Sequence, residues 1–417
     1  MPDTERAAGA AQEPDLPAKG GWDRQTWAVV FSGFCAFLGL YATQPLLPLL
    51  EEYFHLGKVA VSLTVTAATV GVAISAPLIG TVADRLGRKR VIVGSACLLA
   101  LATLLDATAT SLPTLVFWRF LQGVFTPGVF AVTVAYIQEE WAGKGAGRAT
   151  AAYVTGTVIG GFAGRMTSGL IASHADWHLV FVALGAASLV AAVVLHAWLP
   201  RERRFTRSSE GASPLAAAID HLRNKRLIGI FAVGFCVLFC LLGTFTYVTF
   251  YLAAAPFNLS PAAIGSLFVV YLVGAVITPP CGSKIDRYGH RTVLAFAIGF
   301  ALLGELLTLS HCLWVVVLGL AAVCSGVFVA QAAANSYIGH VAEHSKALAV
   351  GLYVTFYYVG GSVGATLPGC VWSLGGWPAC VALFALVQII TVTIALTTWR
   401  IPTALTSGDA YSGVRPD

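Results

Sequence analysis

The chain has 417 residues, of which 57% are hydrophobic and 11% charged, and its mean hydropathy is +0.78. Soluble globular domains carry about 25% charged residues, so this composition excludes an ordinary water-soluble domain and indicates a chain that uses lipid as its solvent. The formal net charge is +5. Because the basic residues follow the membrane topology set out below, this charge does not indicate a nucleic-acid partner.

Twelve apolar segments are long enough to cross a bilayer, because about 20 apolar residues in a helix span its hydrocarbon core. None shows the residue-by-residue alternation of a transmembrane β-strand, so helices are the expected spanning structure. We predict an all-α membrane protein with twelve transmembrane helices in two pseudo-symmetric six-helix bundles. The predicted spans are 25–49, 59–83, 91–110, 112–138, 148–173, 177–199, 227–255, 261–284, 292–310, 312–339, 347–374 and 377–399.

Polar segments divide the chain. The first 24 residues lack the basic-then-apolar pattern of a cleaved signal and predict a disordered cytoplasmic tail. A long inner loop separates the two halves, and Pro214 to Leu222 within it predict an interfacial helix. The predicted domains are a tail at 1–24, a bundle at 25–199, a loop at 200–226, a second bundle at 227–399 and a tail at 400–417.

The basic residues predict the orientation. Lys58 is the one Lys or Arg in an outer loop, and Arg119 and Arg165 fall inside spans, so the other 22 of the 25 lie in tails or inner loops. Basic residues favour the cytoplasmic side. We therefore expect a multi-pass membrane protein with both termini in the cytoplasm.

The first span ends in LYATQPLLPLL, where Pro45 and Pro48 interrupt the helical hydrogen bonds near the outer surface. Tyr41 and Gln44 are polar groups at membrane depth, and such groups usually face the interior of a bundle. We expect both to line a substrate site.

The loops after the second and eighth spans read GTVADRLGRKR and GSKIDRYGHR, with the same spacing of glycine, acid and cation. The two copies contain Gly80, Asp84, Arg85, Gly87 and Arg88, and Gly282, Asp286, Arg287, Gly289 and Arg291. They resemble motif A of the major facilitator superfamily, which joins the second and third helices of each six-helix half.

This resemblance implies a gating role for both copies. Asp84 and Asp286 would each face the positive N-terminus of a helix across the seam between the halves. In the first copy, Arg85 or Arg88 would pair with Glu139 or Glu140 at the inner end of the fourth span. Such contacts would hold the outward-facing state.

Two carboxyl groups lie inside the third and ninth spans, Asp106 and Glu305. Two interpretations are open. Either residue takes part in proton coupling, or it snorkels to the surface, since these two helices are peripheral in this fold. The first, fourth and seventh spans contain no carboxylate in mid-membrane, unlike proton antiporters.

The fourth span contains Arg119 and Gln122, which are three residues apart and share a helix face. A buried Arg needs partners or water. Either Arg119 faces a central cavity beside Gln122, which we favour, or it snorkels toward the outer surface.

The fifth and eleventh spans form a second internal repeat, in which 152–169 aligns with 352–369 at an offset of 200. Small residues on one helix face allow two helices to approach closely. We therefore expect these two spans to pack against each other at the seam. The glycines concerned are Gly160, Gly161, Gly164, Gly360, Gly361 and Gly364.

Arg165 breaks this repeat, because Ala365 occupies the matching position. An unmatched charge points to function more than to packing. Arg165 either pairs with an acid at the depth of Asp106 or faces the cavity and binds an anionic substrate group, and we favour the second. The other residues expected to line the cavity are Tyr247, Gln331, Asn335, Tyr353 and Tyr357.

Together with RFLQG in the fourth span and LYVTFYYVGGSVG in the eleventh, these features resemble the YnfM-like branch of bacterial major facilitator transporters over residues 25–400. The resemblance implies a location in a bacterial inner membrane and transport by alternating access. It also implies proton-coupled efflux of a small amphipathic or anionic organic compound, such as a drug, sugar or metabolite, as in multidrug resistance. The alternatives are an importer or facilitator of an organic anion, with Arg119 and Arg165 holding a carboxylate, and a non-transporting sensor or scaffold.

Enzymatic activity is not expected, since the chain contains no Ser/His/Asp set, phosphate loop or metal-ligand cluster in its sequence. We expect no cofactor and no metal. The expected partners are the lipid bilayer, a small-molecule substrate and protons, with the protein working as a monomer.

Overall fold

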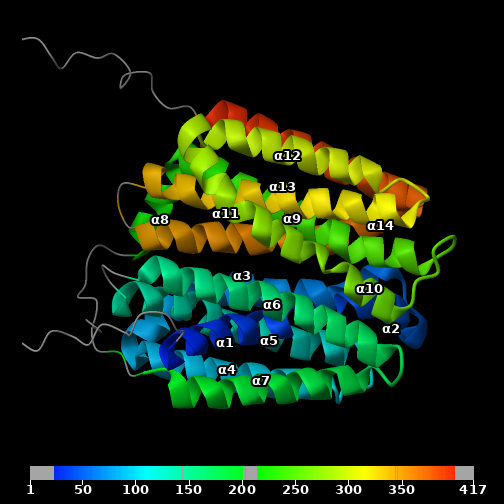
Figure 1. Ribbon diagram of the computed structural model, residues 1–417, viewed down its shortest axis with the longest axis horizontal. Helices are drawn as coiled ribbons and strands as arrows, with labels where there is room; N and C mark the ends of the chain where they lie inside the picture. The colour runs from blue at the N-terminus through cyan, green and yellow to red at the C-terminus, as the bar shows by residue number, and fades with distance from the viewer. Residues whose placement is uncertain are drawn as a thin grey trace, which may run out of the picture.

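The computed structural model describes residues 23–141, 145–200, 202, 214–342, 344 and 346–399. Within these residues the regular structure is helical and contains no strand. The long axes of the helices run nearly parallel across the molecule (Figure 1). The tails predicted at 1–24 and 400–417 lie outside the described residues, apart from Asp23 and Arg24.

The first bundle begins at α1, where the side chain of Asp23 accepts a hydrogen bond from the backbone N–H of Thr26 at 2.8 Å and so caps the helix. Pro45 and Pro48 follow, and here the chain leaves the α-helix for a 3₁₀ turn before α2, as the sequence indicates. The elements are α1 (Arg24–Leu38), η1 (Gln44–Leu46), α2 (Leu47–Phe54), α3 (Lys58–Leu86), α4 (Arg88–Asp106), α5 (Leu112–Glu140), α6 (Ala146–Ala172) and α7 (His178–Trp198).

The second half begins with α8, which confirms the short helix predicted in the inner loop. Its last element is divided by a break at Gly375 and Gly376, where Gly376 adopts φ 63°. The elements are α8 (Pro214–Arg223), α9 (Lys225–Ala253), α10 (Pro261–Leu267), α11 (Val270–Tyr288), α12 (His290–Leu307), α13 (Leu313–Val341) and α14 (Lys346–Thr398).

The twelve predicted spans all coincide with described helices or parts of them. By length and apolarity, eight helices among the described residues qualify as membrane spans, and one of the eight contains the break at Gly375 and Gly376. The structure is therefore consistent with twelve spans.

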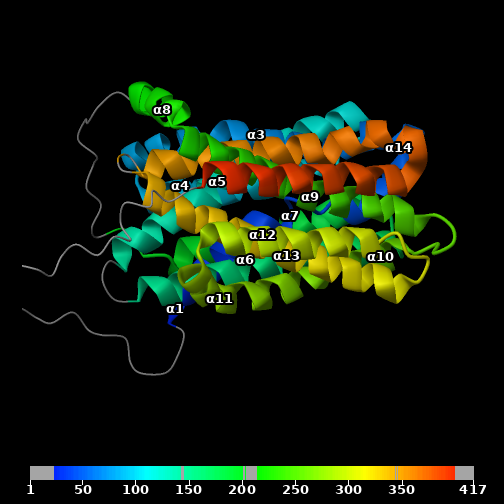
Figure 2. The same cartoon turned by 90° about the horizontal axis from the view of Figure 1, so that it is seen from above.

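The helices form two bundles that lie side by side, α1–α7 below and α9–α14 above in Figure 1. In the view from above the two bundles overlap, and the helices again run along the long axis (Figure 2). Within the first bundle α1 packs on α6 and α3 packs on α5; within the second, α9 packs on α14 and α12 on α13. Between the bundles, α3 contacts α14 and α6 contacts α10.

The expectation that the fifth and eleventh spans pack against each other is wrong. A Cβ added at Gly160 or Gly164 of α6 would lie within 2.4 Å of the backbone of α1, at Phe34 and Leu38. Gly360 and Gly364 of α14 face the backbone of α9 in the same way. The glycines thus allow close packing, as expected, but within each bundle, because each glycine face has the first helix of its own half as its neighbour.

The remaining two glycines of this set, Gly161 and Gly361, face side chains. Gly161 lies near the guanidinium of Arg165, with 3.3 Å between an added Cβ and Nη1, and Gly361 faces Leu238 of α9. Gly161 therefore borders the cavity between the bundles, whereas Gly361 packs against α9 of its own bundle.

The two motif copies adopt one backbone geometry. Gly87 ends α3 with φ 94° and ψ 145°, and Gly289 ends α11 with φ 82° and ψ 150°. Positive φ favours glycine because it has no Cβ. Each glycine N–H donates to the carbonyl four residues earlier, so both copies make the same sharp turn into the next helix.

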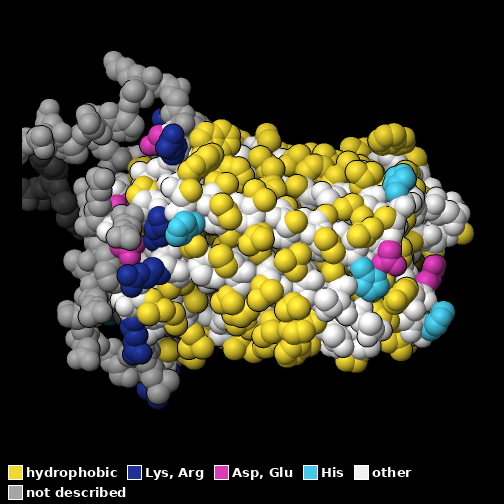
Figure 3. Space-filling model, turned by 90° about the horizontal axis from the view of Figure 1, so that it is seen from below, with side chains coloured by type: hydrophobic (Ala, Val, Ile, Leu, Met, Phe, Trp, Pro, Cys, Tyr) yellow, Lys and Arg dark blue, Asp and Glu magenta, His cyan; other side chains and the backbone are white. Residues whose placement is uncertain are grey.

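These turns lie at one end of the molecule, which we call the basic end. It carries Arg85, Lys89, Lys284 and Arg287 at the α3–α4 and α11–α12 junctions. Figure 3 shows the Lys and Arg side chains of one face gathered at this end. The opposite end carries η1, α2 and α10 (Figure 1).

Candidate functional site

A cavity of about 440 Å³ lies between the two bundles. Five residues expected at the substrate site line it. These are Tyr41, Arg165, Gln331, Asn335 and Tyr357. Its wall is otherwise mostly apolar or aromatic, as in small-molecule sites with a few placed polar groups.

Arg165 supplies the cationic group of this wall. Its side chain is 2% exposed, its Nε donates to Oε1 of Gln44 at 2.8 Å, and its Nη1 donates to the carbonyl of Gly161 at 2.8 Å. Among the described residues, the ion pairs include none to Arg165. Of the two alternatives open for Arg165, the geometry therefore corresponds to the cavity and not to an acid partner.

Aromatic rings surround the guanidinium of Arg165. Its Cζ lies 4.8 Å from the ring centre of Tyr41 and 4.7 Å from those of Phe268 and Tyr271. Cation–π contacts of this length stabilise a charge that has left water. The rings hold the planar group in place without neutralising its charge.

Sequence reasoning missed Phe268 and Tyr271. They are three residues apart beside the break between α10 and α11, and they reach Arg165 from the other bundle. The signal was present, since two aromatics at this spacing share a helix face. Tyr358, next to Tyr357, also lines the cavity and was missed.

Gln44 does not line the cavity but contacts Arg165. It is fully buried, and while its Oε1 accepts from Arg165, its Nε2 donates to Oγ1 of Thr246 in α9 at 3.1 Å. One side chain of η1 thus connects the charged wall of the cavity with the opposite bundle.

The bundles are hydrogen-bonded to each other at the end opposite to the basic end. The hydroxyls of Thr66 and Thr366 are 2.6 Å apart, and that of Ser362 donates to Thr69 at 2.8 Å. The hydroxyl of Tyr247 donates to Ser62 at 3.3 Å. Tyr247, which we expected to line the cavity, therefore lies in this contact zone toward the η1 end.

Toward the basic end the same face of α3 has no such neighbour. Gly80 follows Thr69 by eleven residues, about three helical turns, and a Cβ added there would meet no atom within 4 Å. The same holds for Gly282 of the second motif copy. Among the described residues, these hydrogen bonds across the seam lie toward the η1 end, whereas the two motif glycines at the basic end have open space beside them.

Arg119 and Gln122 lie outside the cavity, contrary to expectation. Arg119 is fully buried inside the first bundle, where it donates to the carbonyls of Thr64, at 3.2 Å, and Gly39, at 2.8 Å. It also donates to Oε1 of Gln122 and lies 4.0 Å from Asp106. The guanidinium of Arg119 thus has its partners within the first bundle, and the surrounding helices separate it from the cavity.

Asp106 and Glu305 are both fully buried, so neither snorkels. Asp106 has Arg119 as its counter-charge. Glu305 accepts a hydrogen bond from Thr244 of α9 at Oε1, while its Oε2 has no hydrogen-bond partner among the described residues. Tyr353 is buried against α9, near Gly234, and does not line the cavity either.

The first motif copy forms a charge cluster within its own bundle. Arg88 binds Asp84 at 2.8 Å and Glu139 of α5 at 2.7 Å. The pairing of Arg88 with Glu139 is one of those expected for the cations of this copy. In the second copy Asp286 and Arg287 are exposed. In this conformation Asp84 points to Arg88 and not to a helix across the seam.

Two bundles of membrane-spanning helices around a cavity are the architecture of a multi-pass membrane transporter. A sequence model of the Major Facilitator Superfamily matches residues 29–256 and 250–410. The chain belongs to this family, and it is a transporter and not an enzyme.

Two curated relatives support the family, and a solved structure supports the fold. The chain is 32% identical to the uncharacterized MFS-type transporter YybF of Bacillus subtilis, covering 88% of this chain and 91% of YybF. It is 32% identical to the inner membrane transport protein YnfM of Escherichia coli, covering 89% of each. The crystal structure of the nucleoside transporter NupG matches with a TM-score of 0.75 at 15% identity, over 90% of this chain and 100% of NupG, which shows a shared fold.

A more distant relative has a named substrate. The 3-(3-hydroxy-phenyl)propionate transporter of Escherichia coli is 27% identical over 62% of this chain and 64% of its own length.

Proposed function

We propose that this protein transports a small organic anion with an aromatic or apolar body, and that Arg165 holds the anionic group. The observation that carries the proposal is a buried guanidinium in the cavity wall whose described partners, Gln44 and Gly161, are neutral. Its Nη2 makes no hydrogen bond among those of the described residues. A carboxylate would supply the missing charge and accept a charge-assisted bond.

The rest of the wall supports an aromatic body. Tyr41, Tyr271 and Tyr357 line the cavity with Phe328, and Gln331 and Asn335 offer amide groups for a hydroxyl or carbonyl. Aromatic faces pack favourably against aromatic ligands. The named substrate of the Escherichia coli relative is an aromatic propionate, which makes 3-(3-hydroxyphenyl)propionate a suitable first probe.

The seam supports alternating access. Rigid-body rocking of two repeats around a central site is the transport mode of such folds. With the basic end in the cytoplasm, as the distribution of Lys and Arg favours, the termini are cytoplasmic and this conformation is inward-facing. A bacterial inner membrane and a monomer of two bundles, at 25–199 and 227–399, belong to the same proposal.

Proton coupling is assigned to Glu305. An ionised carboxylate is costly to bury without a cation, and Glu305 has a hydroxyl, from Thr244, in place of one. Glu305 therefore has an environment suited to holding a proton and releasing it when the bundles move. Export of the anion in exchange for protons is the proposed direction, and import or facilitated passage of the same anion is the alternative.

Proteoliposomes with an internal pH dye test the proposal. We expect 3-(3-hydroxyphenyl)propionate to drive proton flux across the membrane, whereas the neutral amide of the same compound does not. Substrate and proton fluxes in opposite directions indicate exchange, and fluxes in the same direction indicate the importer. Equal transport of acid and amide would contradict the anion assignment.

A further inference from the structure

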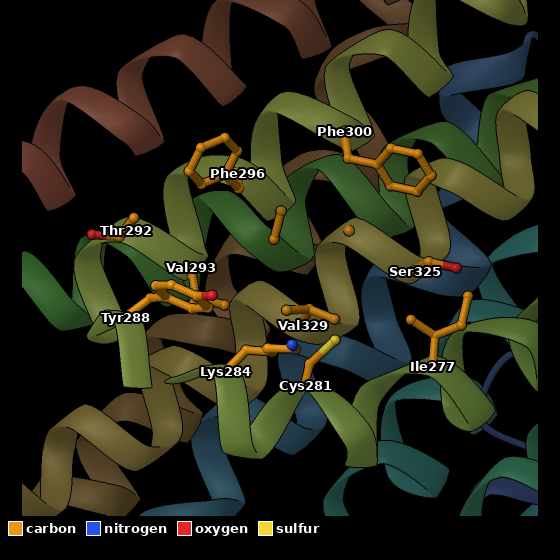
Figure 4. Close-up of a pocket in the computed structure, with 12 residues that line it drawn as sticks. Ile277, Cys281, Lys284, Tyr288, Thr292, Val293, Phe296, Phe300, Ser325 and Val329 are labelled. Atoms are coloured by element: carbon orange, nitrogen blue, oxygen red, sulfur yellow. The ribbon is translucent and has the colours of Figure 1, made fainter. Parts of the chain in front are cut away.

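A second cavity, of about 490 Å³, opens on the outer side of the second bundle, between α11, α12 and α13. Figure 4 shows the residues that line it, with Phe296 and Phe300 projecting from one helix along its length. Phe296 is 78% exposed and Ile277 is 39% exposed. Since this surface belongs to membrane spans, the groove faces the acyl chains of the bilayer and not the transport cavity.

One end of the groove is polar and cationic. Lys284, Tyr288 and Thr292 lie there, at the basic end of the molecule, and the nitrogen of Lys284 points into the groove in Figure 4. The ion pairs of the described residues do not include Lys284. An exposed lysine at the mouth of an apolar groove offers a cation to an anion that has an apolar body.

Lys284 is not a copied feature of the repeat. It lies two residues after Gly282, and the first motif copy has Val82 two residues after Gly80. The turn geometry is the same in both copies, at Gly87 and Gly289. The turn therefore does not require a cation at this position.

The length of the groove fits one leaflet. Thr292 and Phe300 are eight residues apart in α12, about 12 Å at 1.5 Å per residue. Half of a hydrocarbon core is about 15 Å. An acyl chain that begins near Lys284 would thus run along Phe296 and Phe300 for most of its leaflet.

We propose that this groove binds one anionic phospholipid from the leaflet at the basic end. The phosphate accepts hydrogen bonds from the amine of Lys284 and the hydroxyls of Tyr288 and Thr292, and one acyl chain fills the apolar part. Basic pockets between membrane helices bind acidic head groups in this manner. A free phosphate would leave the apolar part empty, and a zwitterionic lipid would bring its own cation to Lys284.

Native mass spectrometry of the purified full-length protein tests the site with phosphatidylglycerol and phosphatidylcholine of identical acyl chains. We expect one phosphatidylglycerol to remain bound at detergent levels that remove phosphatidylcholine. Lys284→Val, which installs the residue of the first motif copy, should weaken this binding at least tenfold. Lys284→Arg should retain it. Lys89→Val removes one charge at the same end, away from the groove, and should leave the binding unchanged.

Several results would overturn the proposal. These are equal retention of the two lipids, equal weakening by Lys284→Val and Lys89→Val, and displacement of the lipid by millimolar inorganic phosphate. A protein dimer that Lys284→Val dissociates would show that a second copy covers the groove instead. If Lys284→Val does not fold, Lys284→Gln provides the same comparison.

Discussion

Arg165 of α6 and Gln44 of η1 are joined by a hydrogen bond of 2.8 Å between Nε and Oε1, and both side chains are buried, with Arg165 in the wall of the cavity between the bundles. Because Gln44 also binds Thr246 of the other bundle, the charge that would hold a substrate is one side chain away from the contacts that close the seam. If Arg165 holds the substrate as proposed, this arrangement couples occupancy of the cavity to opening of the seam.

The first prediction concerns substrate binding at Arg165. Lysine keeps the charge but loses the planar fork that matches a carboxylate, so Arg165→Lys should weaken binding of 3-(3-hydroxyphenyl)propionate. Arg165→Ala should weaken it roughly 10- to 150-fold in Kd, since a hydrogen bond to a charged group contributes about 1.5–3 kcal/mol. Titration calorimetry on purified protein measures both.

Arg85→Ala is the control for Arg165, since it removes an exposed cation outside the cavity. If Arg165→Ala binds the probe normally but melts several degrees lower, Arg165 has a structural role and the substrate assignment fails.

The second prediction concerns the gate. Thr246→Val removes the hydrogen bond from Gln44 without changing the size of the side chain. A neutral hydrogen bond contributes about 0.5–1.5 kcal/mol, so the balance between closed and open seam should shift about 2- to 12-fold toward opening at the η1 end. Spin-label distances between α3 and α14 at that end report the shift.

Thr249→Val is the matched control for the gate. Thr249 is buried in the same helix, but its hydroxyl donates to the carbonyl of Thr246 within α9. An equal shift in both variants would mean that α9 as a whole has loosened, and that the bond to Gln44 has no gating role.

The third prediction concerns proton coupling through Glu305. Glu305→Gln resembles the protonated carboxyl and preserves an acceptor for Thr244. It should therefore abolish substrate-driven proton flux while probe binding and probe–probe exchange continue. Proteoliposomes loaded with a pH dye and labelled probe separate the two activities. Undiminished proton flux in Glu305→Gln would assign coupling to another group.

The fourth prediction concerns Asp106, to which we assign a role in stability, unlike the role in proton coupling proposed for Glu305. Asp106 lies 4.0 Å from Arg119, and both are fully buried. Removing one partner of a buried pair costs about 3–5 kcal/mol because the other charge stays behind. Asp106→Asn should therefore lower the Tm strongly in detergent, and the double variant with Arg119→Gln should recover part of the loss. A Tm equal to that of the unchanged protein would mean that the pair contributes no stability.

The fifth prediction concerns the first motif copy. In this conformation Asp84 binds Arg88, and the gating hypothesis places it against a helix across the seam when the basic end closes. Asp84→Asn should then reduce transport and increase the reaction of a cysteine at Gly80→Cys with thiol reagents from the basic end. The position accepts a side chain, since an added Cβ meets nothing within 4 Å. Equal reaction with and without Asp84→Asn would remove the gating role.

Much of the fold could be predicted from the sequence, because lipid imposes one simple rule: a segment that crosses it must be apolar and satisfy its own backbone hydrogen bonds. Apolar length therefore predicts the spans, and Pro45 and Pro48 predict the break in the first of them. The repeat at an offset of 200 likewise indicates two related bundles, and its departure at Arg165 singles out the one cation that the cavity wall contains among its described residues.

Only the tertiary structure decided which neighbour each side chain meets. Arg119 and Arg165 look alike in sequence, since both are cations in apolar helices, but one lies beside Asp106 and the other among neutral groups and aromatic rings. Small residues permit close approach of a helix but do not specify which helix it is. The sequence therefore predicts that the glycines of α6 pack on the eleventh span, now part of α14, although they pack on α1. The physical reason is that spanning depends on a segment's own composition, whereas charge neutralisation and packing depend on which helices become neighbours in the fold. Those neighbours are close in the chain for Asp106 and Arg119 and more than a hundred residues apart for Phe34 and Gly160.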